Sequence, residues 1–464
     1  MNVSAPRLVP PRITPPAKPL KGLAFLAAFV RNPLEVAPQA VYEQDLFANP
    51  VGRIQRLWIT SPALVKAVLL DEREKFQKLS QIRLLAPLLG KGILTSEGAE
   101  WKWQRQASAP MFRHQDLLGF VPAFVRASDA LVARWRAAPA GSVQPVDRDM
   151  TRATFDVISA TLLPSADHAT VEESMGLFQR SGGWGQLYAM AGAPRWLPHP
   201  GMVSGARAIR MLRSAVAAML RERRGIEAAA GAAPAGGGAP DDLMHRLMRA
   251  HDPESGQSMN DERLIDNLLT FYLAGHETTA RALAWTLYLV ARSPEWGAVL
   301  EEEIGRVTGG GPVGGAHIEQ LVLVQQVLKE SMRLYPPVPL LSRQCVAATR
   351  LDGIEVAPGA TVVMPIYAMH RHAKRWEDPD AFDPARFAPD REAKIPRYQY
   401  LPFGAGPRIC IGMAFAMIEA TAMLATLLQK ARFAPVAGRD PYPLARVTLQ
   451  PGGGLPLKVQ MRKL

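Results

Sequence analysis

One of the two cysteines of this chain lies in a glycine-rich loop that runs directly into a helix-like segment. Residues 403–412 read FGAGPRICIG, and the apolar run MAFAMIEATAMLATLLQKA follows. The thiolate is the form of cysteine that binds metals, and N–H groups at a helix N-terminus stabilise it. Cys410 therefore pairs a metal-binding side chain with a position that favours its charged form. Cys345, in SRQCVAATR, has no such surroundings and is expected to be a packing residue.

A second chemical feature interrupts a long apolar segment, residues 264–292. No proline breaks this segment and apolar side chains fall on nearly every face, which indicates a helix buried through the protein. Its central stretch AGHETT, residues 274–279, holds a glycine, which costs about 1 kcal/mol relative to alanine. It also holds a carboxyl group, which needs a partner when buried. Thr278 can bond back to a carbonyl of the preceding turn and open a notch, or the stretch is an incidental packing feature.

Two further segments carry side chains at helical spacing. KESMRLYPP places Glu330 and Arg333 three residues apart, and EGAEWKWQRQ places Trp101 and Arg105 four residues apart, so each pair shares one helix face. An exposed ion pair of this kind contributes almost nothing to stability. Taken alone, both patterns are common surface patterns.

In their order along the chain, these elements resemble the cytochrome P450 family. The family's haem-binding loop, Phe-x-x-Gly-x-Arg-x-Cys-x-Gly, is matched at Phe403, Gly406, Arg408, Cys410 and Gly412. AGHETT resembles the family's Ala-Gly-x-Glu/Asp-Thr element, KESMRLYPP its Glu-x-x-Arg helix, PARF at 384–387 its Pro-x-Arg-Phe, and WKWQR its Trp-x-x-x-Arg helix. The resemblance extends from about residue 41 to residue 463.

The resemblance implies a role for each matching residue. Cys410 would be the thiolate ligand of haem iron, and Glu277 and Thr278 the acid–alcohol pair that delivers protons during dioxygen activation. The other cofactor-binding residues that it implies are Trp101, Arg105, Ala274, Gly275, Arg343, Phe403, Gly404, Arg408 and Gly412. The arginines among them would bind the haem propionates in forked geometry. Glu330, Arg333 and Arg386 would form a structural trio that locks the loop before Cys410.

The substrate pocket is also implied by the resemblance. It would draw on residues 82–89, 177–190 and 338–341, and the residues singled out within and beyond them are Leu85, Leu88, Thr270, Ala274, Val338, Leu340 and Val447. Most of these side chains are apolar. An apolar or amphipathic substrate is therefore expected, unless several of these residues belong to the core.

The implied reaction is monooxygenation, a hydroxylation or related oxidation that uses haem b (iron protoporphyrin IX) and O2. No flavin, nicotinamide or iron–sulfur segment is recognisable, so electrons would come from NAD(P)H through a separate ferredoxin or flavodoxin and its reductase. Three alternatives remain open: a peroxide-driven peroxygenase, decarboxylase or lipid isomerase, a non-catalytic haem sensor or carrier, and a protein without haem in which Cys410 is structural. The first often lacks the acid–alcohol pair, and the second does not need it.

The expected architecture is mainly α with small β-sheets, the cytochrome P450 fold, with haem between the long central helix and the cysteine loop. Residues 1–40 are expected to form a proline-rich arm and a first helix, and residues 41–464 a single haem domain. GIEAAAGAAPAGGGAP, residues 225–240, is predicted to be a flexible linker between helices. Strand-like pieces occur near residues 51–65 and 345–365, and ARVTLQPGGGLPLKVQ looks like a hairpin with a glycine turn.

Composition limits the setting and the partners. The chain has 464 residues, 48% of them hydrophobic, and two cysteines cannot make a disulfide framework, so a cytoplasmic, reducing location is expected. The net charge of +12 suits an acidic redox carrier. No Lys/Arg cluster is interleaved with aromatics, which argues against nucleic acid. The apolar run at residues 23–30 is far shorter than the about 20 residues that span a bilayer and does not fit a signal peptide. We expect a monomer without an integral membrane segment.

Overall fold

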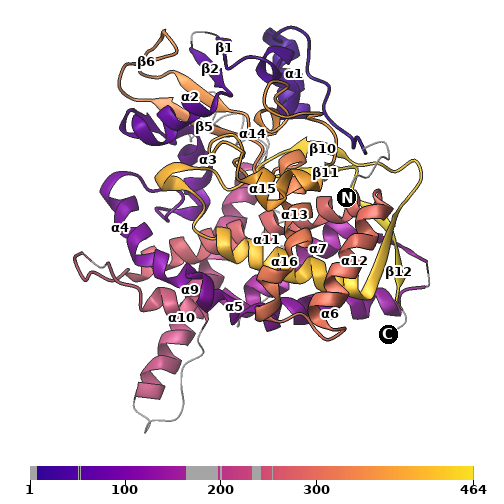
Figure 1. Cartoon of the computed structure of the whole chain (residues 1–464). Coiled ribbons are helices and arrows are strands. Elements are labelled where there is room, and N and C mark those ends of the chain that lie inside the picture. The colour runs from indigo at the N-terminus through magenta and orange to yellow at the C-terminus, as the bar shows by residue number, and fades with distance from the viewer. Residues whose placement is uncertain are drawn as a thin grey trace. The chain divides into compact units, whose positions relative to one another are not determined.

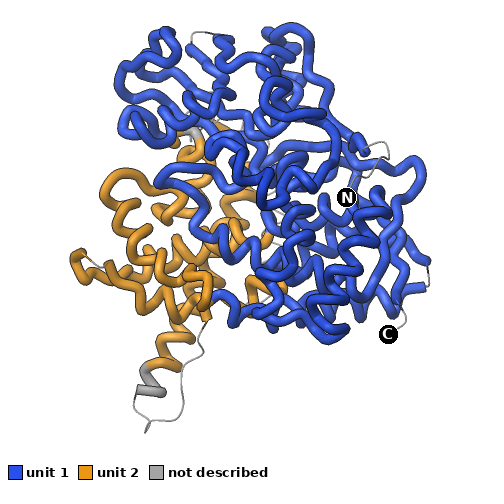
Figure 2. The backbone as a smooth tube through the Cα atoms, in the orientation of Figure 1, with its two compact units in different colours: residues 1–77, 117–155, 277–464 blue, residues 78–116, 156–276 orange. Residues whose placement is uncertain are grey.

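The computed structural model describes residues 8–50, 52, 54–139, 141–162, 197–198, 201–231, 242–252 and 254–462 (Figure 1). The chain divides into two compact units, each built from separate stretches of sequence (Figure 2). Unit 1 comprises residues 1–77, 117–155 and 277–464, and unit 2 comprises residues 78–116 and 156–276. The helices α5 (His114–Leu118), α7 (Val146–Leu162) and α11 (Asp261–Ala291) continue from one unit into the other. The residues expected to act together are therefore divided between the two units.

Helices form most of unit 1. The helix α16 (Met413–Lys430) is apolar at most positions and packs against α6 (Val121–Ala137), α12 (Pro294–Thr308) and α13 (Val322–Leu334). The ring of Phe415 meets Phe120 and Phe124 at the start of α6. The remaining helices are α1 (Gly22–Arg31), α2 (Pro62–Lys66), α14 (Ile366–Met369) and α15 (Pro389–Glu392), with short helical turns η1 (Pro33–Val36), η2 (Gln39–Tyr42), η3 (Ala67–Asp71), η4 (Arg73–Lys75), η6 (Gly315–Gln320), η7 (Pro384–Phe387) and η8 (Gly406–Arg408).

The largest sheet of unit 1 has five strands in the order β1-β2-β8-β5-β3, which are Leu46–Ala48, Arg56–Ile59, Thr361–Met364, Leu341–Cys345 and Phe76–Gln77. The strands β2 and β8 are parallel and the other pairs are antiparallel. Cys345 lies in the apolar core of this sheet beside Val362 and Met364. Its thiol donates to the carbonyl of Ala347 at 3.0 Å, so the expectation that Cys345 is a packing residue is confirmed.

Three smaller sheets complete unit 1. The strands β6 (Thr349–Leu351) and β7 (Ile354–Val356) form one antiparallel pair, and β10 (Tyr442–Ala445) and β11 (Leu449–Gly452) form another. The strand β12 (Pro456–Met461) pairs with β9 (Ala431–Pro435) on one side and β4 (Val143–Pro145) on the other. Helices with small sheets are the predicted fold class, which the structure confirms.

The glycine turn after β11 does not join the strands on either side of it into a hairpin, so that prediction was wrong. The strand β11 pairs with the strand before it, and β12 pairs in a different sheet. Gly453 and Gly454, with φ of 83° and 79°, redirect the chain between the two sheets in a conformation that favours glycine. Alternating apolar residues identified the two strands, but such a pattern does not say which neighbour each strand pairs with.

Unit 2 contains α3 (Leu79–Leu89), α4 (Gly98–Ser108), α9 (Met202–Gly231) and α10 (Leu243–Met248), with the turn η5 (Ala109–Phe112). The helix α9 extends to Gly231, which is seven residues into the segment predicted to be a linker. Three successive alanines at 228–230 favour this extension, because alanine is the strongest helix former. The remaining residues of that segment, 232–240, lie outside the described residues.

The proline-rich arm binds along unit 1 through its carbonyl groups. The carbonyl of Leu8 accepts from Phe382 N at 2.8 Å, and the carbonyl of Pro11 accepts from the Tyr335 hydroxyl at 2.7 Å. Arg12 forms an ion pair with Asp380. Proline lacks an N–H but keeps its carbonyl, so the arm is attached mainly as an acceptor. Among the residues described, no helix is long and apolar enough to cross a membrane.

Candidate active site

The Cys410 loop is held by its own backbone. Cys410 N donates to the carbonyl of Phe403 at 2.9 Å, and Ile409 N donates to that of Gly406 at 3.1 Å. Gly412 is the N-cap of α16, so Cys410 lies just before the first turn of a helix of 18 residues. Its thiol is exposed. The two cysteines therefore differ: burial raises the pKa of the Cys345 thiol, whereas Cys410 is accessible at a helix N-terminus, where a thiolate is stabilised.

Gly406 is required by this loop for two reasons. Its φ is 70°, and a Cβ added there would lie 2.4 Å from the carbonyl oxygen of Leu69. Gly404 has a similar φ of 71°, but an added Cβ would only touch a side-chain atom of Leu341 at 3.8 Å. The close backbone approach that the structure shows at Gly406 is thus to Leu69.

The helix α11 is helical throughout and buried along most of its length, and beyond the exposed first residues Asp261 and Glu262 the exception is Ala274. Ala274 is exposed, and Gly275 and Thr278 are half-buried, although residues 279–291 are all buried. A Cβ added at Gly275 would lie 3.0 Å from Ile158 Cδ1, so glycine allows α7 to pack closely. Nδ1 of His276 lies 2.9 Å from the carbonyl of Tyr272, one turn earlier. Beyond its first turn, the most exposed residue of α11 is Ala274, in the stretch that the sequence singled out.

Glu277 contacts the hairpin β10–β11. Its Oε1 accepts from Thr448 Oγ1 at 2.8 Å and from Gln450 Nε2 at 3.2 Å, and Arg281 Nη2 lies 3.6 Å from the same oxygen. Sequence reasoning missed these partners. Arg281 follows Glu277 by four residues, a spacing that could have suggested the pair, but Thr448 and Gln450 are more than 170 residues away and give no local signal.

A buried acid connects α11 to the helix that follows the Cys410 loop. The hydroxyl of Thr279 hydrogen-bonds the carboxyl of Glu419, and burial raises the pKa of Glu419 to about 8 in spite of this bond. The contact brings the residue after Thr278 against α16. Sequence reasoning did not select Glu419, although a single acid among the apolar residues of that helix was a usable signal.

Glu330, Arg333 and Arg386 lie together, as the resemblance implied. Glu330 Oε2 and Oε1 accept from Arg333 Nε and Nη2 at 2.7 and 2.8 Å, and Arg386 Nε lies 3.5 Å from Oε1. Arg333 also donates to the carbonyls of His370, Pro379 and Ala381 at 2.7, 2.7 and 2.9 Å. The trio thus holds backbone segments that precede the Cys410 loop.

His370 is a further structural residue that the sequence did not indicate. Its Nε2 accepts from Leu401 N at 2.8 Å, and the carbonyl of Leu401 accepts from Gly404 N at 3.1 Å. Burial, with the charges of Arg333 and Arg371, lowers the pKa of His370 to about 3, so the ring is neutral and Nε2 stays an acceptor. The loop is connected to the trio through His370, whose carbonyl accepts from Arg333 and whose ring accepts from Leu401 N.

The arginines expected at the haem propionates come from both units. Arg343 is buried on β5, where its Nη1 donates to the carbonyl of Ser342 at 2.8 Å, and Arg408 is half-buried in η8. Trp101 and Arg105 are half-buried on α4 of unit 2. Trp101 and Arg105 lie on the helix that the sequence predicted, and Arg408 lies in the predicted loop. Their contact with propionates stays a prediction.

The residues expected to bind substrate are similarly distributed. Leu85 and Leu88 lie on α3 of unit 2, half-buried and buried respectively, and Val338 and Leu340 are half-buried in unit 1. Val447 is 51% exposed at the tip of the hairpin β10–β11. Residues 177–190 lie outside the described part of the chain. These substrate contacts stay predictions.

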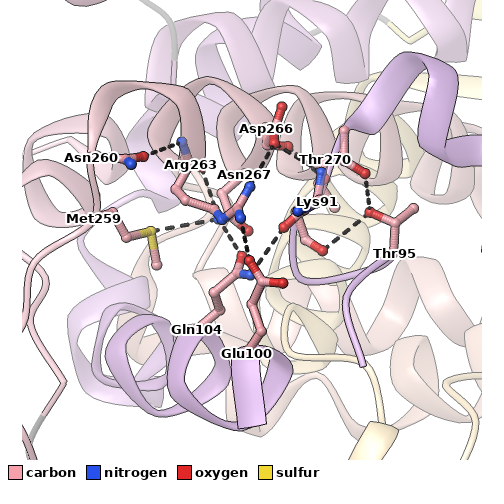
Figure 3. Close-up of polar contacts among 12 residues, drawn as sticks. Lys91, Thr95, Glu100, Gln104, Met259, Asn260, Arg263, Asp266, Asn267 and Thr270 are labelled. Atoms are coloured by element: carbon pink, nitrogen blue, oxygen red, sulfur yellow. Dashed lines mark hydrogen bonds and ion pairs between the residues drawn. The ribbon is translucent and has the colours of Figure 1, made fainter. Parts of the chain in front are cut away.

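The polar residues in the first half of α11 have structural partners in unit 2 (Figure 3). Asp266 accepts from Lys91 N at 2.8 Å, and Asn267 accepts from Ile93 N at 2.9 Å and donates to Gln104 at 2.7 Å. These bonds attach the segment after α3 to α11. They explain why polar residues interrupt an apolar helix without any part in chemistry.

Thr270 is another polar residue of α11 that packs against the segment after α3. Its hydroxyl donates to the carbonyl of Asp266 at 2.7 Å, and a Cβ added at Gly92 would lie 2.5 Å from that hydroxyl oxygen. Thr270 is buried and packed against the backbone at Gly92. In this conformation its polar atom is engaged within the protein.

The residues present fit a haem whose iron takes a sulfur ligand. Cys410 offers an accessible thiol as a soft ligand, the loop that carries it is held by backbone bonds and by Gly406, and arginines suited to carboxylates lie in the same unit on β5 and η8.

Comparison with known proteins agrees with this fit. The sequence model of the family "Cytochrome P450" matches residues 14–455. Cyclooctatin synthase of Streptomyces melanosporofaciens is 30% identical over 95% of this chain and 94% of its own length, and cyclooctat-9-en-7-ol 5-monooxygenase of the same organism is 31% identical over 90% and 88%. The crystal structure of the cytochrome P450DA heme domain superposes with a TM-score of 0.82 at 27% identity, covering 97% of this chain and 99% of that one. The chain therefore belongs to the cytochrome P450 family and is a monooxygenase of that family.

Proposed function

We propose that this protein inserts one oxygen atom from O2 into an apolar or amphipathic organic substrate, with haem b held by Cys410 and electrons from a separate carrier. The observation that carries the proposal is the contact between Thr279 and Glu419. It joins α11, at the residue after the acid–alcohol pair, to the helix that begins at the cysteine loop. A passive haem carrier has no need for the acid Glu277 and the alcohol Thr278 beside this contact.

Bound haem supplies the activation of dioxygen, which a thiolate ligand favours by donating electron density. Cys410 would be that ligand, Arg343 and Arg408 would hold propionates, and Trp101 and Arg105 would do so from α4. Forked guanidinium groups suit carboxylates. The protein's part is to hold the cofactor, orient the substrate and exclude water.

Glu277 and Thr278 would manage protons. A carboxyl that takes a proton from water can pass one to a neighbouring hydroxyl, and the hydroxyl passes its own proton onward, which is general acid catalysis through a relay. Thr278 is half-buried beside the exposed Ala274, so its hydroxyl lies at the accessible part of α11. The carboxyl of Glu277 is held nearby on the same helix.

The substrate would be recognised chiefly by burial of apolar surface. Leu85, Val338 and Leu340 are half-buried, and Val447 is exposed, so each has apolar surface left to cover. Covering such surface favours binding in proportion to the area removed from water. The relative named for cyclooctat-9-en-7-ol makes that compound a reasonable member of a test panel.

The electron donor would be a ferredoxin or flavodoxin with its NAD(P)H-dependent reductase. Such carriers are usually acidic, and the net charge of +12 favours their association. Reduction by either carrier should therefore slow as the salt concentration rises. A rate that does not change with salt would contradict electrostatic docking.

Three measurements test the proposal. The carbon monoxide difference spectrum of the reduced protein should show the red-shifted band of thiolate ligation, Cys410→Ala should abolish it, and Cys345→Ala should retain it as the matched control. Thr278→Ala should lower the fraction of electrons recovered in product when O2 and a reduced carrier are used. Unchanged coupling in Thr278→Ala, or turnover with peroxide but none with O2 and a reduced carrier, would refute the proposed use of O2.

A further inference from the structure

We infer that Thr448 and Gln450 are positioning residues that hold the Glu277 carboxylate against the hairpin β10–β11, and that a ligand which moves the hairpin tip releases it for proton transfer. The inference rests on the proposed function, in which Glu277 delivers protons. It adds how the availability of Glu277 for proton transfer is controlled.

The hydrogen bonds that hold the Glu277 carboxylate are formed between buried side chains. Glu277 is 8% exposed and Thr448 3% exposed, and both donors from the hairpin bond the same carboxylate oxygen, at 2.8 and 3.2 Å. Hydrogen bonds to an ionised acceptor are stronger than those between neutral groups. Arg281, 3.6 Å from the same oxygen, adds a positive charge from α11 itself. The carboxylate is therefore held firmly in this position.

This position is not the one from which Glu277 would pass a proton to Thr278. Adjacent residues of an α-helix project about 100° apart. A Glu277 carboxylate that contacts β11 thus lies on a different side of α11 from the Thr278 hydroxyl. Proton transfer toward Thr278 requires the carboxyl to leave the hairpin donors first.

Each strand of the hairpin is anchored by hydrogen bonds to residues outside it, whereas the tip lies between these anchors. Leu449 accepts from Trp285 Nε1 at 3.1 Å and donates to the carbonyl of Pro337 at 2.9 Å. On the other strand, Ala445 N donates to Asn32 Oδ1 at 3.1 Å. Both edges of the hairpin are therefore anchored to buried residues. Only residues 446–448 lie between these anchors.

The tip combines an exposed apolar side chain with the residue that holds Glu277. Arg446 N donates to the carbonyl of Thr448 at 2.9 Å, which closes the loop around Val447. Val447 is exposed, so an apolar ligand gains by covering it. A shift of Val447 passes through one peptide unit to Thr448. The neighbouring contacts that such a shift would disturb are the hydroxyl bond from Thr448 to Glu277 and the bond from Arg446 Nη1 to the carbonyl of Arg31 at 3.2 Å.

The test uses the haem-loaded protein reduced by NADPH through a ferredoxin and ferredoxin reductase, without any substrate. Thr448→Val removes the hydroxyl and keeps the shape, and it should raise substrate-free NADPH consumption on the order of 10-fold, the factor for one hydrogen bond to a charged group. Thr448→Ser retains a hydroxyl and should behave as the unaltered protein. Gln450→Leu should act in the same direction as Thr448→Val.

The control for loss of a buried hydroxyl is Thr426→Val. Thr426 is fully buried, and its hydroxyl donates to the carbonyl of Ala422 within α16 at 2.7 Å. This variant should leave NADPH consumption unchanged. A rise as large as that of Thr448→Val would overturn the inference, because a general loosening of the protein would then explain both.

A double substitution separates the inference from the function on which it rests. In a Glu277→Gln background, Thr448→Val should change consumption less than about twofold, because the held group is no longer an acid. An undiminished effect there would overturn the inference while the proposed function stands. The substrate for the last comparison is the member of a panel of apolar compounds that gives the largest spin-state shift on binding. If Glu277→Gln alone leaves product formation from this substrate unchanged, Glu277 has no role in proton delivery, and the inference fails as well.

Discussion

The buried trio of Glu330, Arg333 and Arg386 gives a stability prediction whose size follows from the structure. Arg333 and Glu330 are both 0% exposed, and the five hydrogen bonds of Arg333 go to the two carboxylate oxygens of Glu330 and to three backbone carbonyls. Arg333→Met leaves a buried charge without its main partner, which costs about 3–5 kcal/mol.

The three carbonyls add to this cost. Each buried acceptor that loses its donor costs about 1–3 kcal/mol, so the total loss for Arg333→Met is at least about 6 kcal/mol. A domain has a free energy of unfolding of about 5–15 kcal/mol. We therefore expect Arg333→Met to be unfolded or to retain no haem, and Arg333→Lys, which keeps the charge but not the forked geometry, to be intermediate.

The matched control is an arginine–glutamate pair at the surface. Arg350 and Glu355 face each other across β6 and β7, with a 2.9 Å contact and side chains 65% and 83% exposed. Arg350→Met should cost no more than about 1 kcal/mol. Urea unfolding followed by circular dichroism, with haem absorbance, measures all three variants. An Arg333→Met protein that unfolds within about 1 kcal/mol of the Arg350→Met protein would refute the reasoning.

Three further predictions concern single positions. Gly406→Ala should reduce haem content strongly, because the added Cβ would lie 2.4 Å from a backbone carbonyl oxygen, whereas Gly438→Ala, at a similar φ of 69° with open space around it, should only lower the unfolding temperature slightly. Burial gives Glu419 a pKa of about 8 in the folded protein, against an ordinary 4.5, so between these values the folded state holds a proton that the unfolded state has lost. The free energy of unfolding should therefore fall as pH rises from 4.5 to 8. Urea unfolding at several pH values should show that Glu419→Gln removes this fall. Tyr335→Phe deletes the hydroxyl that donates to Pro11 and should cost about 1 kcal/mol in urea unfolding, and a loss below 0.3 kcal/mol, roughly that of a surface change, would contradict a firm arm contact.

The sequence was most informative where chemistry and periodicity coincide in one segment. The Cys410 loop, the long helix α11 and the helix α13 with its Glu-x-x-Arg pair could each be predicted because their signals are local. A thiol before an apolar helix, or thirty residues without proline, is visible without knowing the fold.

The partners of these segments could not be predicted, because they come from distant parts of the chain. Thr448 lies in the turn before the short strand β11, and Gln450 lies on that strand, whose pattern indicates a strand and nothing more. His370 stands between Met369 and Arg371, with a second histidine at 372, and its role depends on a bond to Leu401 that only the fold creates. The prediction that β11 pairs with β12 was wrong for the same reason, because alternating apolar residues do not show which strands lie next to each other.

The attachment of the N-terminal arm determines the order in which the chain can be completed. Pro11 is bonded to Tyr335, 324 residues later, and Ile13 to Tyr367, 354 residues later. At a synthesis rate of about 5–20 residues per second, the arm waits roughly 15–65 s after its own synthesis before Tyr335 is made. Prolines suit that wait, because a segment with few N–H groups cannot join a helix or a sheet on its own. The arm is therefore made well before its partners and attaches only after them, and its composition keeps it unpaired until then.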